Sequence, residues 1–434
     1  MPKKRVITAI DLGTEKCVTI IAVTDEETGE LKVVGVSVVP SKGMKRSVIV
    51  DLDQVLSTIS QSIDAAERMA GFDIRSVYVA VSGTHITSKN SKGVVAVAAP
   101  DQEITAHDVE RVIEAARAIS LPADKKIMHV IPRDFKVDSQ EGIKDPVGMT
   151  GVRLESEAHI ITGMNTSLRN LEKVINDLGL EVEGFVFAGL SASEVVLSET
   201  EKELGAVVVD MGAGTTSLSA FVDGALQYSG SVPVGARHIT QDIALGCRIS
   251  LDNAEKVKVL LSSPAHSEIK PQPGESKQEL MKRRKQADQL DLSRHGIQES
   301  VDTLSKRTVV EGIMMPRIKE IFELIGDELE KHEVLDKVPA GIILCGGGAH
   351  TVRIVEVAKR TLNLPVRIGQ PTAVNGLVSD IQGPAYAASI GLLEYGKNRG
   401  GSAVAPAGLS SLLEGINIKG LAGRVRELIR SMMP

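Results

Sequence analysis

Two short segments of the chain place an aspartate just ahead of glycines and hydroxyl-bearing residues. Glycine has no Cβ and accepts positive φ, so the backbone N–H groups of such a turn can approach the oxygens of a phosphate. A carboxylate at a strand end can hold Mg²⁺ through water, because magnesium loses its hydration shell reluctantly. The residues are Asp11, Gly13, Thr14 and Lys16 in the first segment and Asp210, Gly212, Gly214, Thr215 and Thr216 in the second.

A single Asp-x-Gly hairpin is weak evidence, because such turns commonly join two strands. The second copy lies in a similar sequence context and strengthens the interpretation. We therefore predict that a phosphate chain is held from both sides, with a magnesium ion bound through water at Asp11 and Asp210.

A third glycine-rich segment follows an apolar run late in the chain. Residues 340–345 predict a buried strand, and Gly346, Gly347 and Gly348 come directly after it, ahead of a helix from about Thr351. Three consecutive glycines cost chain entropy, which favours a backbone that must touch a flat or charged ligand. A tight strand-to-helix turn is the alternative explanation. We predict that this segment closes the same site.

Glu255 and Lys258 are candidates for contact with the ribose or purine of a nucleotide. They are three residues apart in a helix predicted over 253–261, and this spacing puts them on one face. Exposed Glu/Lys pairs at this spacing often do no more than support the helix, and that alternative stays open.

The elements around the two aspartate segments repeat. β-rich runs over 6–10 and 18–23 flank the first segment, and the run 206–209 leads into the second. In both halves a Gly-x-Leu step then begins a third strand, at Gly29 and at Gly224. The repeat predicts an α/β fold of two matched halves.

Each half also ends in a helix that begins with small residues, over 188–195 and 384–391. A cleft between two such halves is a common place for a ligand. We expect the phosphate site there.

Residues 85–164 differ in texture from both halves and predict an inserted subdomain. They begin with a polar stretch. We expect a strand over 94–98, a helix over about 108–119, and further strands over 127–131 and 159–162.

Residues 262–300 have the weakest structural signal. Pro264, Pro271 and Pro273 break helices, and residues 282–285 form a basic run. A solvated loop or surface helix explains this run, whereas a patch for nucleic acid would need interleaved aromatic residues. We expect no nucleic-acid partner.

Composition excludes several classes of protein. The 434 residues are 42% hydrophobic and 24% charged, as in a soluble protein of two or more domains. No apolar run reaches the roughly 18 residues that a membrane span needs. The three cysteines form no disulfide framework or metal-ligand spacing. The apolar stretch after the basic start is too short for a signal peptide, so we expect a cytosolic protein.

Residues 420–434 predict an amphipathic helix with a basic bias. Its apolar side chains recur at helical spacing, with arginines beside them. These residues are Leu421, Val425, Leu428, Ile429 and Met432 on the apolar face, with Arg424, Arg426 and Arg430 next to it. A flexible linker rich in Gly, Ser, Ala and Pro is predicted over 397–419. A core-packed helix is the alternative, but the linker and the basic charge favour a helix that lies on a membrane surface.

The three glycine-bearing segments resemble those of the ATPase superfamily that includes actin, sugar kinases and the heat-shock chaperones. Over nearly its whole length, the chain resembles the FtsA family of bacterial cell-division proteins. The segments that carry the resemblance are HVIP at 129–132, EGIKDPVG at 141–148, GVR at 151–153, FAGL at 187–190, PR at 316–317, RIG at 367–369 and GLLEYGK at 391–397.

This resemblance implies an actin-like duplicated α/β ATPase fold, with two lobes around a nucleotide cleft and an α+β subdomain inserted in the first lobe. In place of the usual fourth subdomain, the resemblance implies an insert located elsewhere in the fold, here residues 85–164. The expected parts are a first lobe (1–84, continued over 165–200 and 378–396), the inserted subdomain (85–164), a second-lobe core (201–231, continued over 340–377), an outer subdomain of the second lobe (232–339), the linker (397–419) and the membrane helix (420–434).

The resemblance also implies a function. Members of the family form ATP-bound protofilaments on the cytoplasmic face of the inner membrane and tether the tubulin-like protein FtsZ there. Residues 85–164 would serve filament contacts and later division proteins, and 232–339 would receive the C-terminal peptide of FtsZ. Lys306 and Arg307 could meet that acidic peptide, although basic surface residues are often only solubilising.

Hydrolysis of ATP is expected to be slow. Faster ATPases of the superfamily orient the attacking water with an acidic or amide residue, where this chain reads Phe187-Ala188-Gly189. Without such a group the machinery of phosphoryl transfer is incomplete. ATP would then act mainly as a structural ligand that fixes the closure of the two halves.

Two other functions were weighed. A metabolic kinase of the same superfamily would need a catalytic carboxylate base, and we find no candidate beyond Asp11 and Asp210. An adaptor related to pilus-assembly ATPases would share the nucleotide turns, but the 141–148 loop and the basic tail speak against it.

Overall fold

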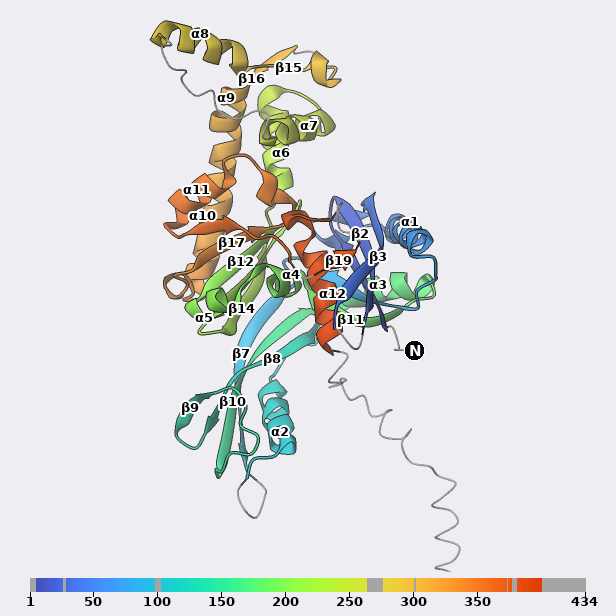
Figure 1. Cartoon of the computed structure of the whole chain (residues 1–434), viewed down its shortest axis with the longest axis vertical. Helices are drawn as coiled ribbons and strands as arrows, with labels where there is room; N and C mark the ends of the chain where they lie inside the picture. The colour runs from blue at the N-terminus through green and yellow to red at the C-terminus, as the bar shows by residue number, and fades with distance from the viewer. Residues whose placement is uncertain are drawn as a thin grey trace, which may run out of the picture. The chain divides into compact units, whose positions relative to one another are not determined.

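Two sheets that share an order of five strands, to which the first sheet adds a sixth, form the framework of the computed structural model (Figure 1). The structure describes residues 5–25, 29–97, 103–263, 276–299, 302–372, 374–376 and 381–399. The first sheet has the order β11 (Glu181–Phe187), β6 (Ser76–Val81), β1 (Arg5–Leu12), β2 (Lys16–Thr24), β3 (Leu31–Pro40) and β19 (Asn375–Gly376). The second has the order β14 (Ala225–Val232), β13 (Thr216–Val222), β12 (Ala206–Met211), β17 (Gly341–Cys345) and β18 (Val366–Ile368).

The pairing within the two sheets confirms the predicted duplication. β1, β2 and β3 form an antiparallel meander, as do β12, β13 and β14. Two strands then join in parallel on the other side, β6 and β11 in the first sheet and β17 and β18 in the second. Asp11 and Asp210 are each the last but one residue of their strand. The repeat therefore puts both carboxylates at equivalent strand ends.

The central strands are apolar on both faces because helices cover the sheets. Val207, Val208 and Val209 of β12 are all fully buried, as near-continuous apolar strands usually are. α1 (Leu52–Ala70) begins at Asp51, which accepts a hydrogen bond from the Gln54 amide at 3.0 Å, and it ends at Gly71 with φ of 82°. The other helices of these lobes are α3 (Asn165–Asp177), α4 (Ala188–Val196), α5 (Glu199–Leu204), α11 (Ile354–Leu362) and α12 (Ala387–Arg399).

The small residues predicted at two helix starts serve the close approach of α4 to α12, which lie side by side in Figure 1. A Cβ on Gly391 of α12 would overlap the carbonyl of Ser191 in α4. The Ser191 hydroxyl donates to the Ala388 carbonyl at 3.1 Å. The two helices therefore pack closely enough for their backbones to approach one another.

The predicted insert is a four-stranded sheet with one helix. Its order is β7 (Thr87–Ala96), β10 (Arg153–Met164), β8 (Lys125–Val137) and β9 (Gln140–Ile143), with α2 (Ala106–Arg117) packed on it. It has a core of its own, which includes Val112, Phe135 and Leu154. The expected strands 127–131 and 159–162 are short parts of much longer strands, and the expected strand 94–98 overlaps only the end of β7, at 94–96. The start of β7 was missed because its residues are polar and take strand form by pairing with β10.

Polar side chains join the insert to the second sheet. His159 of β10 contacts the hydroxyl of Ser229 in β14 at 3.0 Å through Nε2, and Asn90 of β7 through Nδ1 at 2.6 Å. The Ser229 amide donates to the hydroxyl of Ser88 at 2.9 Å. The insert thus contacts the second half of the duplicated fold directly.

The outer part of the second half is mainly helical. It contains α6 (Ala236–Cys247), α7 (Leu251–Ser262), α8 (Lys277–Asp288), β15 (Gln289–Asp291), β16 (Thr303–Ser305), α9 (Lys306–Val309) and α10 (Met315–Lys331). Within the stretch 262–300, the basic run 282–285 lies in helix α8, in agreement with the surface-helix alternative, and a capping box of Ser276 and Glu279 starts this helix. Residues 264–275 lie outside the described residues.

Lys306 and Arg307 form the first turn of α9. A π-helical turn over Val310–Met314 joins α9 to α10 without a break. Arg307 Nε donates to Glu311 at 2.7 Å.

At its far end, α12 continues to Arg399, so the predicted linker over 397–419 is wrong for its first three residues, which are helical. The rest of that linker and the predicted helix over 420–434 lie outside the described residues. Among the helices of the described part, none combines the length and the apolar character that crossing a membrane requires.

Candidate functional site

A cavity of about 590 Å³ opens where the carboxyl ends of β1, β12 and β17 meet. Residues predicted from both halves of the sequence line it together. They are Asp11, Gly13, Thr14, Lys16, Asp210, Gly212, Gly214, Thr215, Glu255, Lys258, Gly346, Gly347 and Gly348. The structure therefore brings together three segments that are far apart in the sequence.

The two aspartate–glycine turns have the same backbone hydrogen bond. The Gly13 amide donates to the Lys16 carbonyl at 2.9 Å, and the Gly212 amide donates to the Thr215 carbonyl at 3.0 Å. A Cβ at either glycine would lie 3.0 Å from that carbonyl oxygen. Each turn is therefore tight enough to need glycine at this position.

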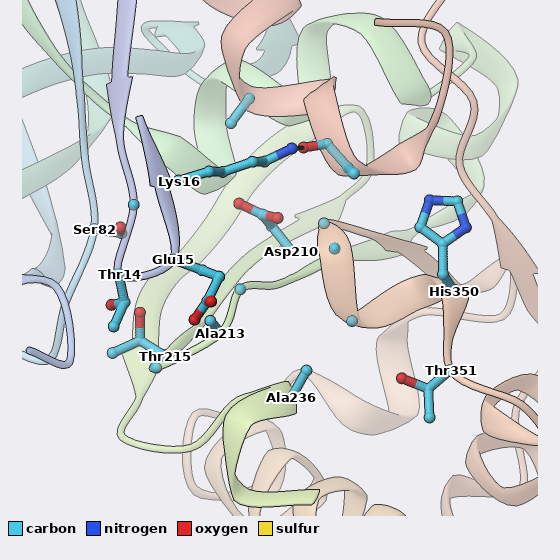
Figure 2. Close-up of a pocket in the computed structure, with 18 of the residues that line it drawn as sticks. Thr14, Glu15, Lys16, Ser82, Asp210, Ala213, Thr215, Ala236, His350 and Thr351 are labelled. Carbon is cyan, nitrogen blue, oxygen red and sulfur yellow. Dashed lines mark hydrogen bonds between the residues drawn. The ribbon is translucent and has the colours of Figure 1, made fainter. Parts of the chain in front are cut away.

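Charge is concentrated on one wall of the cavity, where Asp11, Lys16 and Asp210 meet. Lys16 Nζ donates to the carbonyl of Ala385 at 3.0 Å and lies 3.5 Å from the centre of the Tyr386 ring. Asp11 accepts a hydrogen bond from the Ser389 hydroxyl at 3.0 Å. Figure 2 shows the Lys16 side chain extending toward this carbonyl, close to Asp210.

Burial makes the two carboxyls poor isolated anions. Burial, and then the charge of Asp11, raise the pKa of Asp210 to about 7 against the opposing charge of Lys16. Burial also raises the pKa of Asp11, against the opposing effects of Lys16 and Ser389. For Lys16, burial lowers the pKa although both aspartates oppose that shift. Two buried carboxyls that repel one another fit a divalent cation, and Lys16 fits the phosphates that such a cation accompanies.

The three consecutive glycines at 346–348 are required for different structural reasons. A Cβ on Gly346, whose φ is 82°, would lie 2.5 Å from an oxygen of Asp210, and one on Gly348 would lie 2.5 Å from Met211 Cγ. Nothing stands within 4 Å of a Cβ placed on Gly347. Packing against the second aspartate turn thus explains Gly346 and Gly348, while Gly347 leaves open backbone beside the cavity.

Glu255 and Lys258 of α7 face the cavity, and Lys258 is only 8% exposed. Lys258 Nζ contacts Glu255 at 2.7 Å and the Thr240 hydroxyl of α6 at 2.9 Å. The alternative of an exposed pair that only supports its helix is therefore wrong for Lys258.

Thr216 was predicted to bind the nucleotide, but it is not among the residues that line the cavity. Its hydroxyl donates to the carbonyl of Val234 at 2.7 Å. Successive side chains of a strand point to opposite faces, and the next residue, Ser217, lines the cavity instead.

Other lining residues had no signal in the sequence. Ser47, from the turn between β4 (Met44–Lys45) and β5 (Val48–Ile49), contacts Thr215, and Ser82 follows β6. Small residues that line the cavity include Ala236 at the start of α6, Ala385 and Ala388. Of these positions, only Ser82 could have been found from the sequence, because it directly follows a predicted strand.

Comparison with known proteins supports a single family. A family model described as "SHS2 domain inserted in FTSA" matches residues 83–162, and one described as "Cell division protein FtsA" matches residues 207–391. The chain is 35% identical over 399 residues to the cell division protein FtsA of Pseudomonas aeruginosa, covering 90% of this chain and 89% of that protein. It is 32% identical over 411 residues to FtsA of Escherichia coli K12, covering 91% of each.

Solved structures that resemble this chain share its fold at low sequence identity. The PilM-PilN type IV pilus biogenesis complex matches with a TM-score of 0.61 and 15% identity, over 90% of this chain and 98% of that one. MreB5 of Spiroplasma citri bound to AMPPNP matches with a TM-score of 0.52 and 16% identity, over 92% and 98%. The fold is therefore that of the actin-like ATPases, with an inserted domain.

Proposed function

This chain belongs to the FtsA family of cell division proteins, and we propose that it is an ATP-dependent filament protein that links the division machinery to the membrane. The cleft binds ATP with Mg²⁺, and copies of the chain assemble into protofilaments. The filament lies on the cytoplasmic face of the inner membrane and anchors FtsZ there. Residues 85–164 contact neighbouring subunits and later division proteins.

The observation that carries this proposal is the pair of matching turns facing one cavity. The turn after Asp11 and the turn after Asp210 each present a glycine backbone from opposite halves. Phosphates bind such backbone amides readily, and MreB5, which has this fold, has been solved with AMPPNP. Asp11 and Asp210 hold the magnesium ion through water, and Lys16 binds the phosphates.

Hydrolysis is slow in this proposal. Ala188 lines the cavity, and its neighbours in the chain, Phe187 and Gly189, also lack an acidic or amide side chain. ATP then serves to hold the two halves in one arrangement. A turnover of about 10 per second or more, within the range of kinases, would contradict this part of the proposal.

The membrane contact comes from residues 420–434. Each apolar side chain contributes at most about 1.5–3 kcal/mol, and each arginine about 1 kcal/mol near anionic headgroups. Ordering a helix of about 12–15 residues cancels much of this, so one copy binds weakly. A filament binds firmly because later copies engage from an already attached assembly.

The membrane proposal is tested with Leu428→Glu in the full chain, bound to vesicles of anionic lipid. We expect this variant to stay in the supernatant on sedimentation. Gly423→Glu is the matched control, because it makes the same charge change on the opposite face of the predicted helix. Equal binding by both variants would contradict the helix.

The peptide of FtsZ docks on the outer part of the second half, 232–339, with Lys306 and Arg307 as candidate contacts. Arg307 is largely exposed but paired with Glu311, so a bound acidic peptide must compete with that carboxylate. Reversing both charges is expected to weaken peptide binding. An unchanged affinity would dismiss both residues.

The nucleotide site is tested by calorimetry of the full chain with Mg-ATP, followed by electron microscopy on anionic lipid. We expect ATP-dependent filaments that lose the lipid when residues 420–434 are removed. A folded protein without affinity for adenine nucleotides would overturn the proposal.

A further inference from the structure

The turn between β4 and β5 brings a serine into the cavity in an unusual backbone conformation. Arg46 has φ of 49° and Ser47 has φ of 60°. A two-residue hairpin turn with positive φ at both positions strongly prefers Asn and Gly. Neither residue of this turn is of that kind, so contacts outside the hairpin must hold it.

Those contacts come from both halves of the fold. The Ser47 amide donates to the Thr14 hydroxyl at 3.1 Å, in the first aspartate–glycine turn. The Ser47 hydroxyl lies 2.8 Å from the Thr215 hydroxyl, in the second turn. Ser47 therefore bridges the two turns that face the cavity.

Gly214 allows this approach. A Cβ placed on it would lie 2.8 Å from the Thr14 hydroxyl and 2.9 Å from the Arg46 Cα. Any side chain at this position would push the hairpin out of the cleft. The second turn thus leaves room for Ser47 beside Thr215.

The hydroxyl-bearing residues Ser47, Ser82 and Thr215 all line the cavity. Ser82 donates to the Ser47 oxygen at 3.4 Å, and one of Ser47 and Thr215 donates in the bond between them. Two hydroxyls that share one hydrogen bond keep a second O–H proton for another acceptor. Figure 2 shows Thr14, Ser82 and Thr215 together on one side of the cavity.

We propose that Ser47 binds the terminal phosphate of bound ATP. Its hydroxyl and that of Thr215 both donate to that phosphate, which then connects the first half to the second. ADP lacks the acceptor, so the two hydroxyls return to each other. The inference rests on the proposed function and adds to it how the protein distinguishes ATP from ADP.

The test is calorimetry of the full chain with Mg-ATP and with Mg-ADP, using Ser47→Gly. Glycine suits the positive φ of this turn, so the variant removes the hydroxyl while easing the backbone. We expect the Kd for ATP to rise about tenfold, the effect of losing one hydrogen bond to a charged group. The Kd for ADP is expected to stay within about twofold.

Arg46→Gly is the matched control, because it eases the same turn without removing a side chain that lines the cavity. It is expected to leave both affinities unchanged. Ser47→Ala, which keeps the strained backbone, should lose the same preference for ATP. Thermal melts without nucleotide show that each variant is folded.

The outcomes separate this inference from the proposed function. If the parent protein binds no adenine nucleotide, the proposed function fails and the inference fails with it. If the parent binds ATP but Ser47→Gly keeps the ratio of ATP to ADP affinity, the proposed function stands and Ser47 is only a turn residue. Equal losses for ATP and ADP would also overturn the inference.

Discussion

The turns after Asp11 and Asp210 have the same backbone and different side chains. Both close with an amide-to-carbonyl bond of 2.9–3.0 Å, and both need glycine at the third position. The fourth, fifth and sixth positions are Thr14, Glu15 and Lys16 in the first turn and Ala213, Gly214 and Thr215 in the second.

Because of this difference, the two halves contribute different chemical groups to the cavity. The first turn supplies a buried cation, since Lys16 lies beside both aspartates. The second supplies space and a hydroxyl, because Gly214 lets the hairpin with Ser47 reach Thr215. The shared backbone suits phosphate on either side, whereas the side chains make the cleft asymmetric.

The largest test of the comparison removes the carboxylate of the second turn. We expect Asp210→Asn to weaken Mg-ATP binding about 100-fold, the upper range for losing a group that orients a metal through its outer shell. The nucleotide-free protein is expected to gain stability at pH 8, because burial disfavours the charged form of this side chain. Calorimetry and thermal melts measure the two effects.

A variant Asp210→Asn with both weaker Mg-ATP binding and a lower melting temperature without nucleotide would contradict this expectation. That result would mean that the carboxylate supports the fold and not the ligand.

The next test replaces the residue at the sixth position of each turn. Lys16→Met removes a charged donor to phosphate, so ATP and ADP affinity should both fall about 30-fold. Thr215→Val, at the equivalent position of the second turn, should weaken ATP more than ADP. Calorimetry with both nucleotides distinguishes a charge effect from a hydroxyl effect.

If Thr215→Val lost ATP and ADP affinity equally, as expected for Lys16→Met, the two turns would not be specialised as described.

The fifth position of each turn tests packing without the ligand. Gly214→Ala should lower the free energy of unfolding by about 1–3 kcal/mol, since an added methyl group collides with Thr14 and Arg46. Glu15→Ala should change it by about 0–1 kcal/mol, because its pairing with Arg237 at 3.4 Å is exposed. Urea unfolding of both variants measures the contrast, and a tolerated alanine at 214 would show that the hairpin has room to move.

The smallest expected effect is on stability, at the contact between His159 of the insert and Ser229 of the second half. Burial and then the charge of Arg133 lower the pKa of His159 to about 3. The folded protein therefore holds this histidine neutral, while the unfolded chain protonates it below pH 6.5. The neutral His159 therefore contributes fully to the free energy of unfolding above that pH, and this contribution falls by about 1 kcal/mol between pH 7 and 5.5.

His159→Gln should remove this part of the pH dependence in urea unfolding. Its ATP affinity should match that of the parent protein, in contrast to variants of the cleft. An identical pH profile in the two proteins would contradict the assignment to His159.

The sequence by itself predicted the parts that depend on short-range geometry. An aspartate, a glycine and flanking β-branched runs determine a tight turn between strands wherever they occur, and their repetition indicated the duplicated fold. The small residues of 188–195 and 384–391 indicated matching helix starts and so supported the same duplication. The FtsA motifs then agreed with the family found by comparison.

Only the tertiary structure decided which side chains face the cavity. Ser47 enters through a hairpin, and the strand alternation that puts Ser217 there turns Thr216 to the opposite face. Packing against Asp210 and Met211, not the ligand, requires two of the three glycines after β17. These outcomes depend on contacts between segments far apart in the chain, and local sequence carries no record of the neighbour that a folded strand or turn will meet.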